Sequence, residues 1–149
     1  MSIVNEIKVD FLSVPENEGF ARLTISAFLL PLNPTMSELS DVKTAVSEAV
    51  TNAVVHAYPE KLGMVMLRVR ILPDERLEIV VKDHGVGIPD VEKAKTPLYT
   101  TGGEERSGMG FTVMDSFMDS IDVASKVGSG TTVRLYKQLE SGRPAAKEA

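Results

Sequence analysis

Two neighbouring segments, 64–72 and 75–83, alternate apolar and polar side chains over almost their whole length. In the first segment, every second residue from Val65 to Ile71 is apolar, and the second segment repeats this pattern. A period of two predicts β-strands that bury one face and leave the other polar. The dipeptide Pro73-Asp74 between the segments is typical of a turn, so we predict a β-hairpin. Its apolar face has to be covered by a second layer of structure.

Two segments upstream supply that second layer, because their apolar residues recur at helical spacing. The first runs from Pro15 to about residue 30 and stops before Pro31, and the second covers 37–57 and stops before Pro59. Acidic residues in the first turn favour the earlier helix. We expect these helices to present the apolar residues Phe20, Leu23, Ala27 and Leu30, and then Leu39, Val42, Val46, Ala49, Ala53 and Ala57.

The remaining pattern completes an α+β fold. We predict further strands at 3–11, 120–126 and 131–137 and a helix at 108–117. The resulting order favours a two-layer α/β sandwich, with a mixed, mainly antiparallel sheet and helices on one face. We expect one domain over 1–140. A weakly patterned segment, 91–107, has the features of a functional lid or a disordered loop, and the polar tail 141–149 is expected to be disordered.

Composition excludes several classes of function. The formal net charge is −5, which argues against a general nucleic-acid binder, since that role requires an excess of basic residues. The absence of cysteine rules out disulfides, thiolate metal sites and cysteine nucleophiles. We found no apolar run long enough to cross a bilayer and no secretion signal, and therefore expect a cytoplasmic protein.

The helix at 37–57 carries three polar residues four positions apart, Glu48, Asn52 and His56. This spacing places a carboxylate, an amide and an imidazole on one face, beside a stripe of small alanines. Magnesium prefers oxygen ligands and keeps several waters, so one amide oxygen together with phosphates can suffice. Taken alone, the same residues also fit the solvent-exposed edge of an amphipathic helix.

Three glycine-containing segments add to this candidate site. The strand 75–83 is followed by the sequence Asp83-His84-Gly85-Val86-Gly87-Ile88. Its carboxylate is suited to accept a hydrogen bond from an exocyclic amine, and its glycines allow the backbone to approach a flat base closely. Glycines that open the helix at 108–117 offer N–H groups to phosphate oxygens. The Thr131 hydroxyl, at the start of the last strand, is a candidate to join Asp83 in holding the base. Each segment alone also fits an ordinary turn.

Taken in this order, the four segments resemble the GHKL ATPase superfamily, which includes the ATP-binding domains of gyrase, histidine kinases and MutL. The forms SEAVTNAVVHAY, VKDHGVGIPD and ERSGMGFTVM are similar to the small bacterial anti-sigma factors with serine-kinase activity, and most similar to the sporulation anti-sigma F factors. The resemblance covers about residues 3–137. It implies Mg-ATP or ADP as cofactors, inhibition of a sigma factor, and phosphorylation of an anti-anti-sigma protein on serine by a homodimer.

The resemblance also implies roles for individual residues. Asn52 would be the magnesium ligand, and Glu48 would be the general base. Nucleotide contacts would come from His56, Asp83, Gly85, Gly87, Ile88, Ser107, Gly108, Met109, Gly110 and Thr131. Glu105 and Arg106 would lie where partner proteins touch the lid.

Two alternatives stay open at this point. One is a regulator that binds ATP only to set its shape and sequesters a sigma factor without catalysis. The other is an ATP-hydrolysing fragment of a histidine kinase or a MutL-like machine. The histidine-kinase reading is weaker, because His56 and His84 are the two histidines and both fall inside the nucleotide segments.

Overall fold

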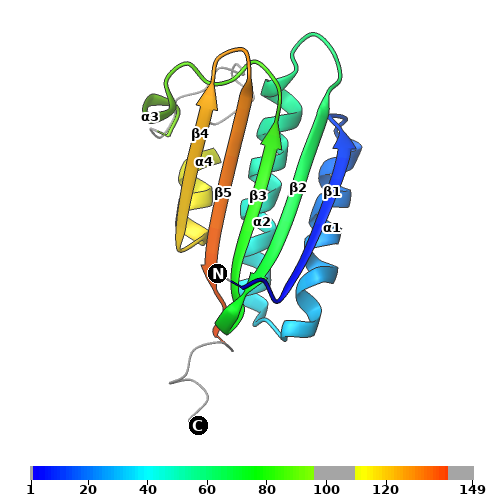
Figure 1. The fold of residues 1–149 in the computed structure, drawn as a ribbon, viewed down its shortest axis with the longest axis vertical. Helices are drawn as coiled ribbons and strands as arrows, with labels where there is room; N and C mark the ends of the chain where they lie inside the picture. The colour runs from blue at the N-terminus through cyan, green and yellow to red at the C-terminus, as the bar shows by residue number, and fades with distance from the viewer. Residues whose placement is uncertain (1, 96–109, 141–149) are drawn as a thin grey trace.

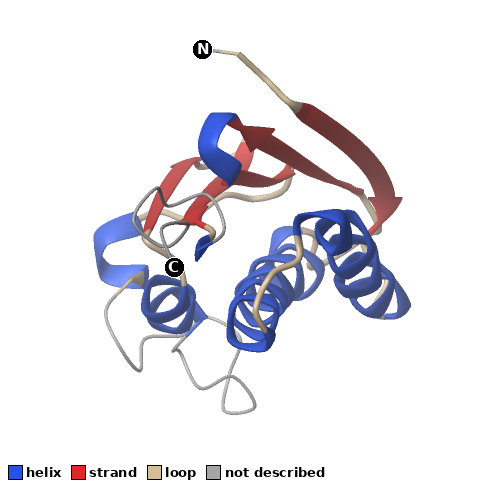
Figure 2. Ribbon diagram, turned by 90° about the horizontal axis from the view of Figure 1, so that it is seen from below, coloured by secondary structure: helices blue, strands red, loops and turns tan. Residues whose placement is uncertain are grey.

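The computed structural model describes residues 2–95 and 110–140, and the account below covers these residues. A single five-stranded sheet in the order β1-β2-β3-β5-β4 forms one layer, and α1, α2 and α4 lie on one of its faces (Figures 1 and 2). All four strand pairings are antiparallel. The predicted α/β sandwich is confirmed. Its strands are β1 (Asn5–Leu12), β2 (Met64–Leu72), β3 (Arg76–Asp83), β4 (Ser120–Lys126) and β5 (Gly130–Gln138), and its helices are α1 (Glu16–Leu29), α2 (Met36–Asn52), α3 (Val91–Ala94) and α4 (Gly110–Phe117).

The hairpin of β2 and β3 is the centre of the sheet, as its alternation predicts. Val65 pairs with Asp83 and Leu72 with Arg76 across the hairpin. The apolar residues of β2 that face the helices are fully buried. The connecting turn needs two left-handed residues, Asp74 with φ 64° and Glu75 with φ 58°. This pairing fixes Asp83 at the end of the hairpin, where the strand runs into the glycine loop.

Helix α2 lies across the middle of the sheet and carries most of the predicted buried stripe. Val42, Val46 and Ala49 are buried in the core. A capping box starts the helix, since Thr35 Oγ1 accepts from Glu38 N at 3.0 Å and Glu38 Oε1 accepts from Thr35 N at 2.9 Å. The same box defines the entry direction of the helix that carries Glu48 and Asn52.

The prediction of one α-helix up to Ala57 was wrong in its last turn. The α-helix ends at Asn52, and Ala53–Ala57 form a π-helical turn. Such wide turns are uncommon and occur frequently at functional sites. Periodicity in the sequence does not distinguish a π-turn from an α-turn, because both keep the alanines facing inward.

Helix α1 is confirmed, but the predicted buried stripe was wrong. Its buried residues are Ala21, Ile25 and Leu29, spaced four apart. The residues expected to be apolar contacts are exposed instead, namely Phe20, Leu23, Ala27 and Leu30. The predicted and the observed stripes both contain apolar residues at helical spacing, so spacing alone does not determine which of them faces the sheet and α2.

Two smaller differences concern the N-terminal residues and the lid. Ile3 and Val4, at the start of the predicted strand 3–11, are exposed, whereas Ile7 packs against the core. A four-residue helix, α3, begins within the segment expected to lack periodicity, because Asp90 Oδ1 accepts from Lys93 N at 3.0 Å. The rest of the segment predicted to be a lid or a disordered loop, 96–107, and the tail 141–149 lie outside the described residues.

The sheet face opposite the helices is polar and carries ion pairs. Glu6 of β1 pairs with Arg70, and Glu78 lies within 3.5 Å of Arg70 and 3.7 Å of Arg68. Cross-strand pairs of opposite charge of this kind support strand register. Within residues 2–95 and 110–140, no helix is both long enough and apolar enough to span a membrane.

Candidate nucleotide-binding site

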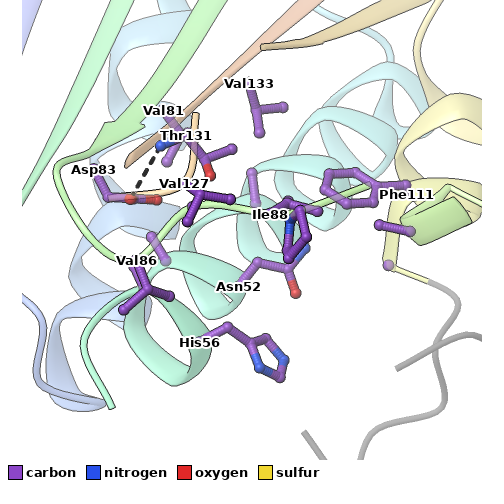
Figure 3. Close-up of a pocket in the computed structure, with 17 residues that line it drawn as sticks. Asn52, His56, Val81, Asp83, Val86, Ile88, Phe111, Val127, Thr131 and Val133 are labelled. Atoms are coloured by element: carbon purple, nitrogen blue, oxygen red, sulfur yellow. Dashed lines mark hydrogen bonds between the residues drawn. The ribbon is translucent and has the colours of Figure 1, made fainter. Parts of the chain in front are cut away.

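A cavity of about 410 Å³ lies between the end of α2, the end of β3 and the start of α4. The loop after β3 and the hairpin between β4 and β5 close its sides (Figure 3). Its size falls in the range of small-molecule and cofactor sites, and its walls are mostly apolar with few polar groups, as is usual for such sites. The cavity is lined by Ala49, Asn52, Ala53, His56, Ala57, Val81, Asp83, Val86, Gly87, Ile88, Pro89, Ala94, Gly110, Phe111, Val127, Thr131 and Val133.

Asp83 is the buried carboxylate of this cavity, with 7% of its surface exposed. Its Oδ1 accepts hydrogen bonds from Gly85 N at 2.9 Å and from Thr131 N at 3.2 Å. Burial raises the pKa of the Asp83 carboxyl above its ordinary value of 3.8, and the two backbone donors oppose that shift. The carboxylate is therefore held in one orientation inside an apolar wall, which suits it to accept from a single ligand donor.

Thr131 lies beside Asp83, but its hydroxyl does not make the bond that joins the two residues. The register of β3 with β5 pairs Asp83 with Thr131, and this brings the Thr131 backbone N–H to the carboxylate (Figure 3). The Thr131 hydroxyl lies 2.8 Å from Ser125 Oγ. The predicted proximity of Thr131 to Asp83 is correct, and a contact of its hydroxyl with a base stays a prediction.

The glycines of the loop after β3 are needed for packing between backbones. A Cβ on Gly85 would lie 2.1 Å from Ala57 O, at the end of the π-turn, and Gly85 does not line the cavity. Gly87 has φ +80°, and a Cβ there would lie 2.4 Å from Lys126 O. The sequence predicts that both glycines make room for a base; Gly87 lines the cavity, so for Gly87 this stays a prediction. In the structure they let the loop sit tightly between the end of α2 and the β4–β5 hairpin.

The residues on α2 divide between two hollows. Asn52 and His56 line the cavity and project from the side of the helix that faces it (Figure 3). Glu48 lines a second hollow, between α1 and α2. Of the three residues that the spacing places on one face, Asn52 and His56 line the cavity and Glu48 does not.

The start of α4 meets both Glu48 and Asn52. A Cβ on Gly110 would lie 3.2 Å from Asn52 Nδ2 and 3.3 Å from Glu48 Oε1. A glycine at this position therefore lets the first turn of α4 lie close to a carboxylate and an amide. The other predicted residues near this turn, Glu105, Arg106, Ser107, Gly108 and Met109, lie outside the described residues.

With this geometry in place, known relatives can be compared. Residues 12–137 match the family described as the histidine kinase-like ATPase domain. The chain is 50% identical over 144 residues to an anti-sigma F factor of Pasteuria penetrans, covering 95% of this chain and 96% of the relative. It is 51% identical to that of Caldanaerobacter subterraneus, covering 96% of this chain and 100% of the relative.

The chain belongs to the anti-sigma F factor family of histidine kinase-like ATPase domains. Solved structures agree on the fold of this anti-sigma F factor family member. One contains the RsbU and RsbW domains of a Mycobacterium tuberculosis protein, with a TM-score of 0.67 and 16% identity, covering 91% of this chain and 33% of that one. Another is a blue-light activated histidine kinase of Erythrobacter litoralis, with a TM-score of 0.54 and 25% identity, covering 68% of this chain and 30% of that one. The family predicted from the sequence is confirmed.

The apolar walls of the site and the Ser125 hydroxyl were not predicted as parts of the site from the sequence. Val81, Phe111 and Val133 form walls of the cavity, and Ser125 bonds to the loop after β3. The alternating pattern of 75–83 predicts a buried face for Val81, and all three wall residues belong to the core. Nothing in the sequence signals the bond from Ile88 N to Ser125 Oγ, because it joins residues 37 positions apart.

The described segments offer few metal ligands in one place. Across residues 2–95 and 110–140, no group of three or more histidines and acidic residues gathers in a way that could hold a metal ion. A magnesium ion at Asn52 would therefore depend on phosphate oxygens and water for most of its coordination, which is a usual arrangement for this ion.

Proposed function

We propose that this chain is a cytoplasmic anti-sigma factor and a Mg-ATP-dependent protein-serine kinase. It would bind and inhibit a sigma factor, and would phosphorylate an anti-anti-sigma protein on serine. The observation that carries the proposal is the cavity itself, which has a buried carboxylate on one wall and Asn52, near Glu48 and Gly110, on another. Relatives half identical in sequence are named anti-sigma F factors, which supports the sigma-factor part.

The wall at Asp83 would bind the adenine ring. The carboxylate is the acceptor for the exocyclic amine, and two backbone N–H groups already hold it in place. Valine and phenylalanine side chains around it give a flat, apolar surface for the ring. Guanine presents a carbonyl oxygen in place of that amine and would be repelled by the carboxylate, so the site favours ATP over GTP.

The wall at Asn52 would bind the phosphates. Asn52 is half-buried and has the amide oxygen that magnesium accepts as a ligand. When bound with ATP, magnesium neutralises phosphate charge. Gly110, at the first turn of the eight-residue helix α4, lies next to Asn52. The positive end of the α4 dipole would therefore also stabilise the negative charge of the phosphates. We further propose that Ser107, Gly108 and Met109 contact the phosphates.

Glu48 would act as the general base. The serine Oγ of the protein substrate attacks the γ-phosphorus, the bond from that phosphorus to the β–γ bridging oxygen breaks, and ADP leaves. Glu48 accepts the proton of the serine hydroxyl in this step. Its position supports the role, because Glu48 Oε1 lies beside the first turn of α4 while its residue also lines the second hollow. A substrate serine can thus approach Glu48 from the second hollow.

A homodimer and a lid-borne partner contact complete the proposal. Phe20 is 53% exposed and Leu23 67% exposed on α1, so apolar surface is available for a second copy or a partner. A symmetric dimer is the commonest form of soluble oligomer. Glu105 and Arg106 would contact partner proteins from the lid.

Phosphotransfer to a candidate anti-anti-sigma protein tests the kinase proposal. With γ-labelled ATP and magnesium, the wild type should yield an acid-stable phosphoserine product, and the Glu48→Ala variant should bind ATP yet yield none. The Glu16→Ala variant, which removes a carboxylate from the first turn of α1, is the matched control and should remain active. No transfer by the wild type together with full sigma-factor inhibition by Glu48→Ala would instead identify a non-catalytic regulator. An acid-labile product, or hydrolysis that needs no partner, would identify a histidine-kinase or MutL-like activity.

A further inference from the structure

The loop that follows β3, residues 84–88, is held in place by hydrogen bonds that its backbone N–H groups donate to neighbouring groups. Gly85 N donates to Asp83 Oδ1, and Val86 N donates to Ala57 O at 2.9 Å. The two outer positions, His84 and Ile88, donate to side-chain hydroxyls from other elements. These N–H groups are therefore used to fix the loop in place and do not face a ligand.

Ser125 provides the hydroxyl at the far end of the loop. Its Oγ accepts from Ile88 N at 2.7 Å and lies 3.1 Å from Gly130 O and 2.8 Å from Thr131 Oγ1. Ser125 is thus the point where the loop, β4 and the start of β5 meet. A backbone bond from Gly128 N to Val86 O, at 2.9 Å, reinforces the same contact.

Tyr58 provides the hydroxyl at the near end. It accepts from His84 N and donates to Met64 O, both at 2.7 Å. The ring occupies space that a side chain at position 63 would fill, since a Cβ on Gly63 would lie 2.2 Å from Tyr58 Cε1. Tyr58 therefore links the end of the π-turn to the start of β2 and to the residue that follows Asp83.

We propose that Ser125 and Tyr58 are positioning residues for the nucleotide, acting through the loop rather than by touching the ligand. This inference rests on the proposed ATP binding. Each hydroxyl holds one end of residues 84–88, and together they keep Asp83 and Ile88 in the arrangement that receives the base. The apparent affinity of a site falls in proportion to the fraction of molecules that hold the competent conformation. Releasing either end lowers that fraction without removing any ligand contact.

A purely structural role makes a different prediction, and two nucleotides separate the two roles. Purine riboside triphosphate lacks only the exocyclic amine that Asp83 would accept. If a variant only reduced the amount of folded protein, its apparent affinities for this compound and for ATP would fall by the same factor. Loss of the Asp83 geometry would weaken ATP more, so that the ratio of the two affinities falls.

The test is calorimetric titration of both nucleotides, with magnesium, into the full-length wild type and three variants. Ser125→Ala and Tyr58→Phe should each bind ATP about tenfold more weakly, with a reduced preference for ATP over the purine compound. The exposed Ser129→Ala, in the same β4–β5 hairpin, should stay within about twofold of the wild type. Ser125→Thr, which keeps the hydroxyl, should recover most of the affinity.

Several outcomes would overturn the inference. One is that the Ser125→Ala and Tyr58→Phe variants each keep the wild-type preference for ATP over the purine compound. Another is a Ser125→Thr variant as weak as Ser125→Ala. If the wild type itself binds no ATP, the proposed function fails first and this inference falls with it, whereas wild-type binding with unchanged variants removes the inference alone.

Discussion

The surroundings of Asp83 fix the orientation and the pKa of its carboxylate, and both suit it to accept a hydrogen bond from one ligand group. The carboxylate is buried, accepts two backbone N–H bonds, and has a pKa raised by that burial. The ionised form is the one that accepts an amine, so the raised pKa limits the pH range of binding from below. Asn52, at the other wall of the cavity, has the complementary role toward phosphate and magnesium.

ATP affinity should therefore fall on acidification earlier than an ordinary aspartate would predict. Protonation of Asp83 removes the acceptor, and its pKa lies above 3.8, so the loss occurs as pH falls through that raised value. Asp83→Asn should bind ATP at least about tenfold more weakly at neutral pH, because its amide presents a donor to a donor. Titration calorimetry between neutral and mildly acidic pH measures both. A wild type and an Asp83→Asn variant with the same pH profile would contradict this role.

Asn52→Ala should separate magnesium-dependent binding from binding of the base. Removal of the amide oxygen should weaken Mg-ATP binding, while binding of adenosine, which has no phosphates, stays within about twofold. Equilibrium binding of both ligands, with magnesium and with chelator, measures the difference. His56→Ala, in the π-turn that follows α2, is the comparison variant. Equal losses for ATP and adenosine would argue that Asn52 supports the fold rather than the cation.

At the scale of elements, the sequence predicted the parts whose signal is periodic. Strand alternation placed β2 and β3 within a residue of their ends. The π-turn at the end of α2 could not be predicted, because it depends on the packing of Ala53–Ala57 against the loop that carries Gly85. The buried stripe of α1 was misjudged for the same reason, since fit to α2 decided it.

The candidate site divides in the same way. Asp83, Gly87 and Thr131 stand at strand ends or in a glycine loop, so local sequence identified them. Ser125 and the role of Gly85 depend on two segments meeting in space, and only the fold reveals them. A residue whose partner is far away in the chain leaves no local pattern to detect.

Gly85→Ala should be strongly destabilising, whereas Gly128→Ala should be mild. A Cβ at 85 would overlap Ala57 O at 2.1 Å, so we expect a loss of about 3 kcal/mol in the free energy of unfolding. At Gly128, φ is +85° but nothing lies within 4 Å, so the cost is limited to about 1 kcal/mol of backbone strain. Urea unfolding curves measure both. Equal losses would show that the π-turn and the loop do not pack as described.

At the scale of the whole molecule, the sheet and α2 hold the cavity between them. The hydrophobic core is continuous with the cavity walls, since Val81, Phe111 and Val133 belong to both. A ligand in the cavity would therefore add contacts to the folded state that the unfolded chain does not make. Ligand binding should therefore raise the free energy of unfolding of the whole domain.

Mg-ATP at about 100 times its dissociation constant should stabilise the fold by about 2.7 kcal/mol. For a domain of this size, that corresponds to a rise in Tm of roughly 6–10 °C. Glu48→Ala should show the same rise, because Glu48 is absent from the lining of the cavity. Thermal unfolding followed by circular dichroism, with and without nucleotide, measures the shift. A Glu48→Ala variant that loses the shift would show that Glu48 serves binding instead of catalysis.

The most direct test is a crystal structure with magnesium and a non-hydrolysable ATP analogue. We predict the adenine amine at the Asp83 carboxylate, the phosphates and magnesium at Asn52, and the Glu48 carboxylate directed toward the γ-phosphate beside Gly110. An empty cavity, or a nucleotide bound elsewhere while Glu48 and Asn52 turn away from it, would contradict the proposed kinase site.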